Sequence, residues 1–203
     1  MDGLLLAGGK SSRMGGRHKG DLLYGNETFT TRMIHEFSKD ADTIWISYGA
    51  KVYGTYENCR IVRDIYPDCG PIGGIHAGLT ACESDEVMVA ACDMPFLKIE
   101  LFRYLKTKMD EAGKQEHIIY DGVVPVLERR MHPLAAIYRK CVAQVMERQI
   151  LSGNYKIRDA FEKMHILYVD VTENENFARM LRNVNTMEEY RMLSVIGVGV
   201  KGF

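Results

Sequence analysis

The sequence lacks any cysteine arrangement typical of a disulfide framework or a zinc knuckle. Its five cysteines are an odd number and include no C-x-x-C pair, whereas such scaffolds pair their cysteines at short, regular spacings. We interpret these residues as reduced thiols that are mostly buried. They are Cys59, Cys69, Cys82, Cys92 and Cys141.

Long apolar runs and net charge are lacking as well. No stretch approaches the roughly 18 apolar residues of a membrane span, and the early apolar run at residues 4–7 is too short for the core of a signal peptide. Lys plus Arg number 26 and Asp plus Glu number 27, a formal charge of -1, so no global basic field favours nucleic acid or an anionic membrane. We expect a cytoplasmic protein with no nucleic-acid or membrane partner, in which any anion site is local.

The 203 residues, 46% of them hydrophobic, are enough to bury most of the surface that the unfolded chain exposes. No repeat, low-complexity tract or linker divides the sequence. We therefore expect a single domain over residues 1–193 and treat residues 194–203 as a C-terminal tail of unknown role.

Short apolar runs bounded by Gly, Asp or Pro alternate with longer segments of helical period. This alternation is typical of βαβ units around a mostly parallel sheet. The polar segment 128–132 between two late strands predicts a hairpin or a lid. Strands are expected at residues 3–7, 43–47, 60–62, 87–91, 117–120, 123–127, 134–138 and 166–171. Helices are expected at residues 28–39, 98–112, 139–151 and 157–163, with others starting at Pro71 and near Thr186.

The most informative stretch is residues 6–19, LAGGKSSRMGGRHK, which follows the first expected strand. Its four glycines let the backbone approach a ligand closely, and their N–H groups can cradle phosphate oxygens. Arg13, Arg17 and Lys19 add mobile positive charge that suits a triphosphate. In an open α/β sheet, ligands bind at the carboxyl ends of the strands. We predict a phosphate-binding loop; the alternative is a long surface loop with incidental charge.

Two stretches look like known nucleotide-binding motifs but lack the required spacing or structural context. Residues 9–11, Gly-Lys-Ser, look like the end of a Walker A loop, but Gly3 lies too far upstream and the apolar residues between belong to the strand. Residues 197–202 contain G-x-G-x-x-G, yet only Phe203 follows, so no helix is available there to receive a pyrophosphate. Neither a Walker A site nor a dinucleotide site is expected.

Carboxylates follow two other expected strands. Asp93 comes after the apolar run 87–91, so its side chain is expected in the same crevice as the glycine-rich loop. Mg²⁺ prefers one or two carboxylates with phosphate oxygens and water, so Asp93 alone suffices as a protein ligand; a cap of the turn before Pro95 is the alternative. For Asp64, a ligand role and a cap role are equally allowed. The proline-started helix after Gly70 offers exposed N–H groups to a base or ribose.

The pattern L-A-G-G-x-S-x-R-M-G at residues 6–15, with Lys19 four residues on, resembles the signature of the molybdenum cofactor guanylyltransferases, a branch of the nucleoside-triphosphate-fold nucleotidyltransferases. The resemblance continues in family order almost to residue 193. It covers Asp64 and the segments 70–74 (GPIGG), 92–95 (CDMP), 130–133 (RMHP) and 183–186 (NVNT).

The resemblance implies an α/β, Rossmann-like three-layer sandwich, with GTP as substrate and Mg²⁺ as cofactor. It implies transfer of GMP to the phosphate of molybdopterin, without a covalent enzyme intermediate. Proteins of molybdenum cofactor biosynthesis and molybdoenzymes are the further partners that it suggests. The residues implied as catalytic are Arg13, Lys19 and Asp93, with Asp93 also the metal ligand. Those implied for the nucleotide are Leu6, Ala7, Gly8, Gly9, Lys19, Ser47, Asp64, Gly70, Gly74 and Asp93, and those for the acceptor are Arg130, His132 and Asn185.

The branch that uses guanine carries Leu-Ala-Gly-Gly and Gly-Pro-x-x-Gly, and this sequence has both, whereas the cytidine branch typically has Leu-Ala-Ala-Gly. The sequence departs from the family at three positions. Ser47 stands where asparagine is frequent, His18 where aspartate usually precedes the lysine, and Met187 where proline is usual.

Several alternatives remain open on the sequence alone. A solvated hairpin turn accounts for Arg130 and His132 as well as acceptor binding does, and Asn185 and Thr186 both suit a helix cap. A transferase that uses CTP or another phosphorylated acceptor is the nearest rival function. A non-catalytic nucleotide or cofactor carrier is the other, although the joint retention of Arg13, Lys19 and Asp93 speaks against it.

Overall fold

The short apolar runs form strands, and the segments of helical period form helices between them. The computed structural model describes residues 1–8, 19–49, 52 and 54–198, with side chains up to residue 193. In chain order the elements are β1 (Asp2–Leu6), the 3-10 helix η2 (Lys19–Asp21), β2 (Leu23–Tyr24), β3 (Glu27–Thr28), α1 (Phe29–Phe37), β4 (Ile44–Ser47), β5 (Cys59–Val62), α2 (Pro71–Ala81), β6 (Glu86–Ala91), α3 (Ile99–Glu116), β7 (Gly122–Leu127), β8 (Arg130–Met131), β9 (Ala135–Arg139), α4 (Val142–Leu151), α5 (Ile157–Phe161), β10 (Ile166–Asp170), α6 (Glu175–Met180) and α7 (Met187–Val198).

The central sheet has the strand order β10-β7-β9-β6-β1-β4-β5, and β8 pairs with β7 beside this path. Strands β6, β1, β4 and β5 run parallel to one another, as do β7 and β10. Only β9, among the strands of this path, runs against both its neighbours. The expected mostly parallel α/β sheet is therefore confirmed, and six of its strands end at one common carboxyl edge.

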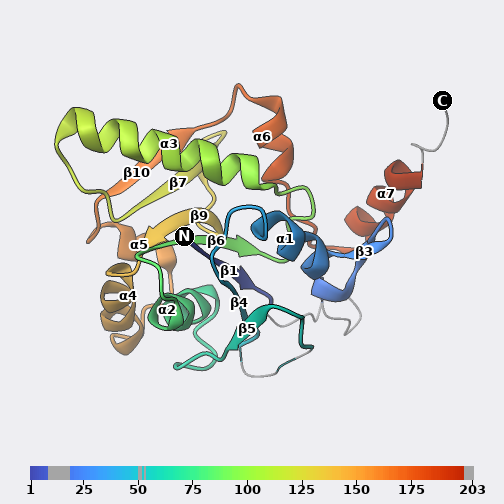
Figure 1. Cartoon of the computed structure of the whole chain (residues 1–203), viewed down its shortest axis with the longest axis horizontal. Helices are drawn as coiled ribbons and strands as arrows, with labels where there is room; N and C mark the ends of the chain where they lie inside the picture. Colours follow the sequence, from blue (N-terminus) through green and yellow to red (C-terminus); the bar gives the residue numbers. More distant parts are fainter. Residues whose placement is uncertain (9–18, 50–51, 53, 199–203) are drawn as a thin grey trace.

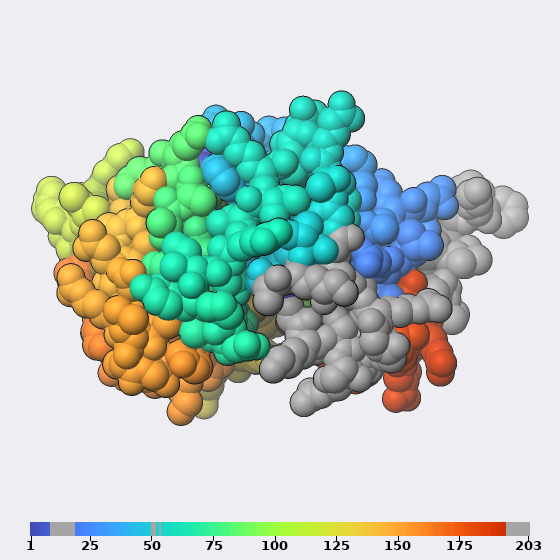
Figure 2. All heavy atoms as spheres, turned by 90° about the horizontal axis from the view of Figure 1, so that it is seen from below, coloured from blue at the N-terminus to red at the C-terminus, as the bar shows by residue number. Residues whose placement is uncertain are grey.

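Successive side chains of a strand point to opposite faces of the sheet, and a separate hydrophobic core forms on each face. On β1, Leu5 faces one core together with apolar residues of α1, α3 and α6. Leu4 and Leu6 face the other core, with α2, α4 and α5. Figure 1 shows α1 and α3 above the sheet and α2 and α4 below it. Figure 2, seen from below, shows the teal-to-green α2 region between the orange α4 region and the blue segment that includes α1. Helices on both faces give the expected three layers.

A third, small core lies outside the two sheet cores. Leu22, Phe29 and Val184 form its buried part, and Tyr190 of α7 packs against it. The Tyr190 hydroxyl also donates to the Leu23 carbonyl at 3.0 Å. Figure 1 shows α7 beside β3, away from the sheet. The helix runs across positions 193 and 194, and the division into domain and tail stays a prediction.

Most expected elements are confirmed to within a few residues, and the segment 128–132 forms the expected hairpin through the pairing of β7 with β8. The strand expected at 117–120 is wrong. His117 caps α3 in the left-handed conformation, and Ile119 is 75% exposed in the connection to β7. Strands β2, β3 and β8 and helix α6 had not been expected. In the described residues no helix is long and apolar enough to cross a membrane.

Candidate active site

The carboxyl ends of three central strands converge at one place on the sheet edge. Leu6, the last residue of β1, pairs with Ser47 of β4 on one side and Ala91 of β6 on the other. Backbone bonds extend this alignment past the strands, from Ala7 N to the Ser47 carbonyl at 2.7 Å and from Cys92 N to the Leu6 carbonyl at 3.0 Å. The segments that begin at residues 7, 48 and 92 therefore leave the sheet side by side.

A lysine, an aspartate and an asparagine meet beside this edge. The Lys19 ammonium donates to Asp93 Oδ2 at 3.0 Å and to Asn185 Oδ1 at 2.8 Å. The lysine side chain is 23% exposed and the aspartate 17%, so the ion pair is partly shielded from solvent. The three predicted residues come from η2, the end of β6 and the segment before α7, and the fold brings them into direct contact.

The segment that carries Asn185 is fastened to the aspartate from a second direction. Val184 N donates to the Asp93 carbonyl at 2.8 Å, and Asn183 Nδ2 lies 3.5 Å from Asp93 Oδ1. Asn183 was not among the site residues predicted from the sequence. The N-x-N spacing of Asn183 and Asn185 is the signal for it, because alternate side chains of an extended segment share one side.

Thr186, rather than Asn185, supplies the side-chain cap of α7. Its Oγ1 accepts from Glu189 N at 3.1 Å, and the Glu189 carboxylate accepts from the backbone N–H groups of residues 185 and 186 at 2.6 and 3.1 Å. This reciprocal pair is a capping box. The Asn185 side chain is thereby left to accept from Lys19. Among the described residues, the side-chain partners of Asp93 are Lys19 and Asn183.

The first strand contributes backbone to the site. Leu6 and Ala7 are buried, whereas Gly8 is exposed. A Cβ on Gly8 would lie 2.9 to 3.0 Å from backbone atoms of Tyr48 and Gly49, so a glycine is needed where these two segments approach each other. The predicted site residues Gly9 and Arg13 lie outside the described residues, as do Arg17 and His18.

A second carboxylate, that of Asp64, lies between the end of β4 and the start of α2. Ser47 Oγ donates to Asp64 Oδ1 at 3.1 Å, and a Cβ on Gly74 would lie 3.7 Å from the same oxygen. Burial raises the pKa of Asp64 above its usual value, while the bond from Ser47 and the nearby His76 act to lower that pKa. Serine thus provides a hydrogen bond at the position where the resembled family often has asparagine.

The helix after this carboxylate starts as the sequence predicts. Pro71 is its first residue, and Gly70 forms the N-cap with φ of 70°, a left-handed conformation that favours glycine. The first turn lies beside Asp64, since Cβ atoms on Gly73 and Gly74 would lie 3.5 and 3.7 Å from its carboxylate oxygens. Predicted residues Ser47, Asp64 and Gly74 lie together, and Gly70 is the N-cap of the same helix.

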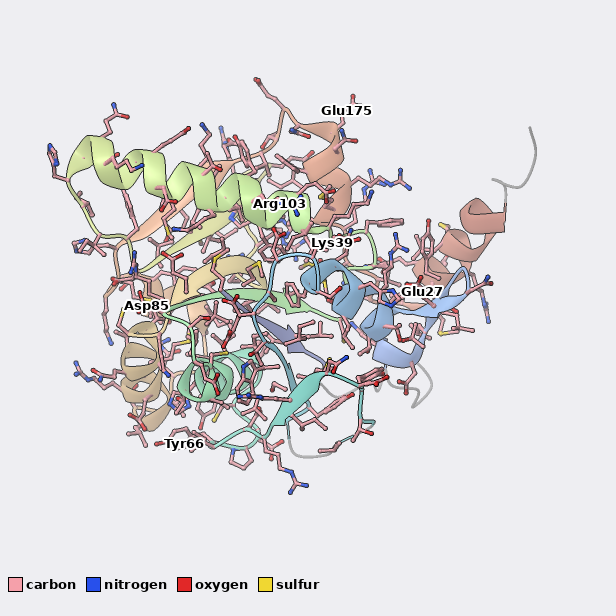
Figure 3. All side chains as sticks on the ribbon, viewed as in Figure 1. Glu27, Lys39, Tyr66, Asp85, Arg103 and Glu175 are labelled. Carbon is pink, nitrogen blue, oxygen red and sulfur yellow. The ribbon has the colours of Figure 1, made fainter. Side chains whose placement is uncertain are left out.

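Behind Asp64, a polar group joins α2 to α4 and was missed by the sequence analysis. His76 is buried, with Nε2 4.0 Å from Glu147 Oε1. The Tyr66 hydroxyl donates to the same oxygen at 2.8 Å, and the Tyr66 ring stacks at a tilt on His76; Figure 3 labels Tyr66 near α2. Burial lowers the pKa of His76, against the opposing effects of Glu147 and Asp64.

The two predicted acceptor residues on the late hairpin differ in exposure. Arg130 on β8 is exposed, whereas His132 is 8% exposed, so a fully solvated hairpin turn is wrong for the histidine. His132 N donates to the Pro125 carbonyl at 3.0 Å, and its Nε2 has no hydrogen-bond partner among the described residues. Burial, followed by the charges of Arg130 and Arg158, lowers the pKa of His132.

The oxygen atoms around the Lys19 ammonium are of the kinds that bind a hard cation. The Asp93 carboxylate and the Asn185 amide oxygen converge on one positive group, and Mg²⁺ takes oxygen ligands of these kinds together with phosphate oxygens and water. Over the described ranges, no group of three or more His, Cys, Asp or Glu side chains is arranged to hold a metal ion. A Mg²⁺ here would be held by Asp93, with Asn185 adjacent.

A cavity of about 940 Å³ opens elsewhere, between the β7–β8 turn and the start of α6. Of the predicted site residues that the structure describes, none lines it. Its walls include Tyr104, Glu128, Arg129, Asp170, Thr172 and Phe177.

Comparisons with known proteins bear on the family and the fold of the chain. A family model described as the MobA-like NTP transferase domain matches residues 3–167. A "probable molybdenum cofactor guanylyltransferase" of Clostridium perfringens (strain 13 / Type A) is 32% identical, and the match covers 93% of each chain. Molybdopterin-guanine dinucleotide biosynthesis protein A from Archaeoglobus fulgidus superposes with a TM-score of 0.80 at 25% identity, covering 97% of this chain and 98% of that one. The 2-C-methyl-D-erythritol 4-phosphate cytidylyltransferase of Thermus thermophilus shares the fold alone, with a TM-score of 0.69 at 11% identity over 96% of this chain and 98% of that one.

Proposed function

This chain belongs to the MobA-like NTP transferase family, and from that premise we propose that it transfers GMP from GTP to the phosphate of molybdopterin. The products are pyrophosphate and the guanine dinucleotide form of the cofactor. Family membership makes the protein a nucleotidyltransferase. The guanine donor and the molybdopterin acceptor are supported by the names of its relatives and by the residues at the sheet edge.

The observation that carries the proposal is the contact of Lys19 with Asp93 and Asn185 at 3.0 and 2.8 Å. Binding of a magnesium nucleotide uses a lysine and a carboxylate too, but nucleotidyl transfer depends on them more strongly. The reason is that negative charge builds on phosphate oxygens during attack and cations placed in advance stabilise that charge.

In the proposed reaction, an oxygen of the acceptor phosphate attacks the α-phosphorus of GTP in line with the leaving group. A new P–O bond forms to the acceptor, the bond from the α-phosphorus to the bridging oxygen breaks, and that oxygen leaves with the electron pair as part of pyrophosphate. Bound Mg²⁺ would neutralise charge on the phosphate oxygens. The Lys19 ammonium would bind the triphosphate, and the N–H of Gly8 would face its oxygens. No side chain of the protein is needed as a nucleophile.

Base selection is assigned to the group formed by Ser47, Asp64 and the first turn of α2. A carboxylate accepts hydrogen bonds, and guanine presents N–H donors that cytosine does not match in position. The bond from Ser47 at 3.1 Å orients the Asp64 carboxylate. On the acceptor side, exposed Arg130 suits a phosphate, and the unpartnered Nε2 of buried His132 suits a polar group of the pterin.

Pyrophosphate release tests this function. Protein, Mg²⁺, GTP and molybdopterin are mixed, and pyrophosphate is measured against a mixture without acceptor and against one with CTP. The proposal expects release that requires both GTP and molybdopterin. Release with CTP but not with GTP would assign the cytidine reaction instead, and binding of GTP without any release would assign a carrier. The Asp93→Asn variant serves as the matched inactive control.

A further inference from the structure

The Lys19 ammonium lies where a bound cation would be held. It is placed between two oxygen atoms, Asp93 Oδ2 at 3.0 Å and Asn185 Oδ1 at 2.8 Å. A carboxylate and an amide oxygen that converge on one point are ordinary ligands of a divalent cation. In this protein that point is taken by the charge of its own side chain.

The backbone segments that carry these two oxygens are fastened to each other, whereas the lysine reaches them on a long side chain. The segment of Asn185 is joined to the backbone of Asp93 by the bond from Val184 N at 2.8 Å, and α7 behind it is closed by its capping box. Lys19 instead reaches the oxygens from η2 on a stem of four carbons, which adopts many rotamers. The ammonium can therefore leave while the backbone that carries the two oxygens keeps its arrangement.

We propose that in the nucleotide-free protein Lys19 acts as an internal counter-ion that keeps divalent cations off Asp93, and that a triphosphate releases this block by drawing the lysine to itself. This inference rests on the proposed function, since it takes Asp93 as the metal ligand. It adds an order to the reaction: the metal enters with the nucleotide and does not load first.

Electrostatic repulsion sets the direction and the size of the expected change in cation affinity. An ammonium and a divalent cation cannot share one carboxylate without strong repulsion, because the pair is only partly exposed to solvent. Repulsion between two cations at contact distance in a site partly shielded from water corresponds to at least about a tenfold change in affinity, so removal of the lysine is expected to strengthen cation binding by at least about tenfold. The negative charges of a bound triphosphate balance the charges of both the Lys19 ammonium and the divalent cation, so the two no longer compete for Asp93.

The test is a titration of the nucleotide-free protein with Mn²⁺, with the free ion measured by electron paramagnetic resonance. Wild type is expected to bind weakly, and Lys19→Met to bind at least about tenfold more tightly. Lys19→Arg keeps the charge and is expected to stay within about twofold of wild type, while Lys19→Met combined with Asp93→Asn is expected to lose the gain.

Lys39→Met is the matched control, because it removes the same charge at the opposite edge of the sheet. Lys39 lies just after α1, where its ammonium is 2.8 Å from Glu36; Figure 3 labels it there. Melting curves verify that each variant is folded. The inference is overturned if Lys19→Met binds Mn²⁺ within about twofold of wild type, if Lys39→Met gains equally, or if the double variant keeps the gain.

The outcome separates this inference from the proposed function. A gain in Mn²⁺ binding by Lys19→Met, with no pyrophosphate released by wild type, would support the counter-ion and refute GMP transfer. Pyrophosphate release by wild type without a gain in Lys19→Met would refute the counter-ion alone.

Discussion

Adding one methyl group at Gly74 should impair nucleotide binding while leaving the fold nearly as stable as before. In Gly74→Ala the new Cβ would lie 3.0 Å from Ser47 Oγ and 3.1 Å from a methyl group of Leu6. Both contacts are tight enough that a neighbour must shift by a few tenths of an ångström. Because a serine hydroxyl can turn about a single side-chain bond, we expect it to move, and with it the bond to Asp64.

The stability terms nearly cancel at this position. Replacing glycine by alanine inside a helix favours folding by about 1 kcal/mol, while a weakened hydrogen bond to a charged group costs about 1.5 to 3 kcal/mol at most. The net change in the free energy of unfolding is therefore expected to be a loss of no more than about 2 kcal/mol. For GTP, loss of a correctly held Asp64 is expected to weaken binding by about tenfold, which corresponds to roughly 1.4 kcal/mol.

Gly78→Ala, one turn further along α2, is the matched comparison. There a Cβ would lie 2.1 Å from a terminal methyl group of Leu4, which is fully buried, and overpacking of this kind costs about 1 to 3 kcal/mol. The gain from glycine to alanine offsets about 1 kcal/mol of this cost as well, so we expect a loss of stability of similar size to that of Gly74→Ala, with GTP affinity within about twofold of wild type. Calorimetric GTP titration in Mg²⁺, well below both melting temperatures, measures the affinities. The reasoning is refuted if Gly74→Ala binds GTP like wild type, or if Gly78→Ala loses as much affinity.

Three further predictions concern the charged groups. Asp93→Asn should lower the transfer rate by at least about two decades yet cost no more than about 1 kcal/mol of stability, since its ion pair is partly exposed; near-normal pyrophosphate release would exclude Asp93 as the metal ligand. Lys19→Ala should reduce GTP affinity and transfer rate together, and Lys19→Arg should restore them only in part; steady-state kinetics within about threefold of wild type would contradict this. Burial raises the pKa of Asp64, so GTP affinity should fall as pH drops through that raised pKa, and Ser47→Ala should move the fall to higher pH because it removes a bond that lowers the pKa. Because the pKa of Asp64 is raised in the folded protein, Asp64→Asn should be more stable than wild type above that raised pKa and equally stable below the pKa of the unfolded chain. If wild type and these variants showed the same pH profiles of GTP binding and of melting temperature, this role of Asp64 would be refuted.

The sheet could be predicted from the sequence because its central strands are continuous apolar runs that end in Gly, Asp or Ser. The strand expected at 117–120 shows where this signal fails. Ile118, Ile119 and Tyr120 have strand-like composition, but the edge position beside β7 is occupied by β10, and the three residues connect α3 to β7 instead. Which of two apolar segments pairs with an edge is decided by packing across the whole chain, which composition does not contain.

The candidate site, too, could be predicted from the sequence only in part. Lys19, Asp93 and Asn185 could be selected through motif resemblance, and the position of Asp93 after a parallel strand also has a physical reason. Their direct contact could not be predicted, because it joins positions 74 and 166 residues apart. His76 and Glu147 were missed because a lone histidine in an apolar helix and a glutamate on a distant helix carry no local signal of their proximity.

Formation of the guanine dinucleotide product tests the central claim most directly. The measurement is simultaneous quantification of pyrophosphate and of the molybdopterin–GMP conjugate, with purified protein, Mg²⁺, GTP and molybdopterin. The account predicts equal amounts of the two products, a strict need for the acceptor, and loss of both in Asp93→Asn. Pyrophosphate that forms without molybdopterin, or no conjugate with GTP under conditions where CTP yields one, would contradict it.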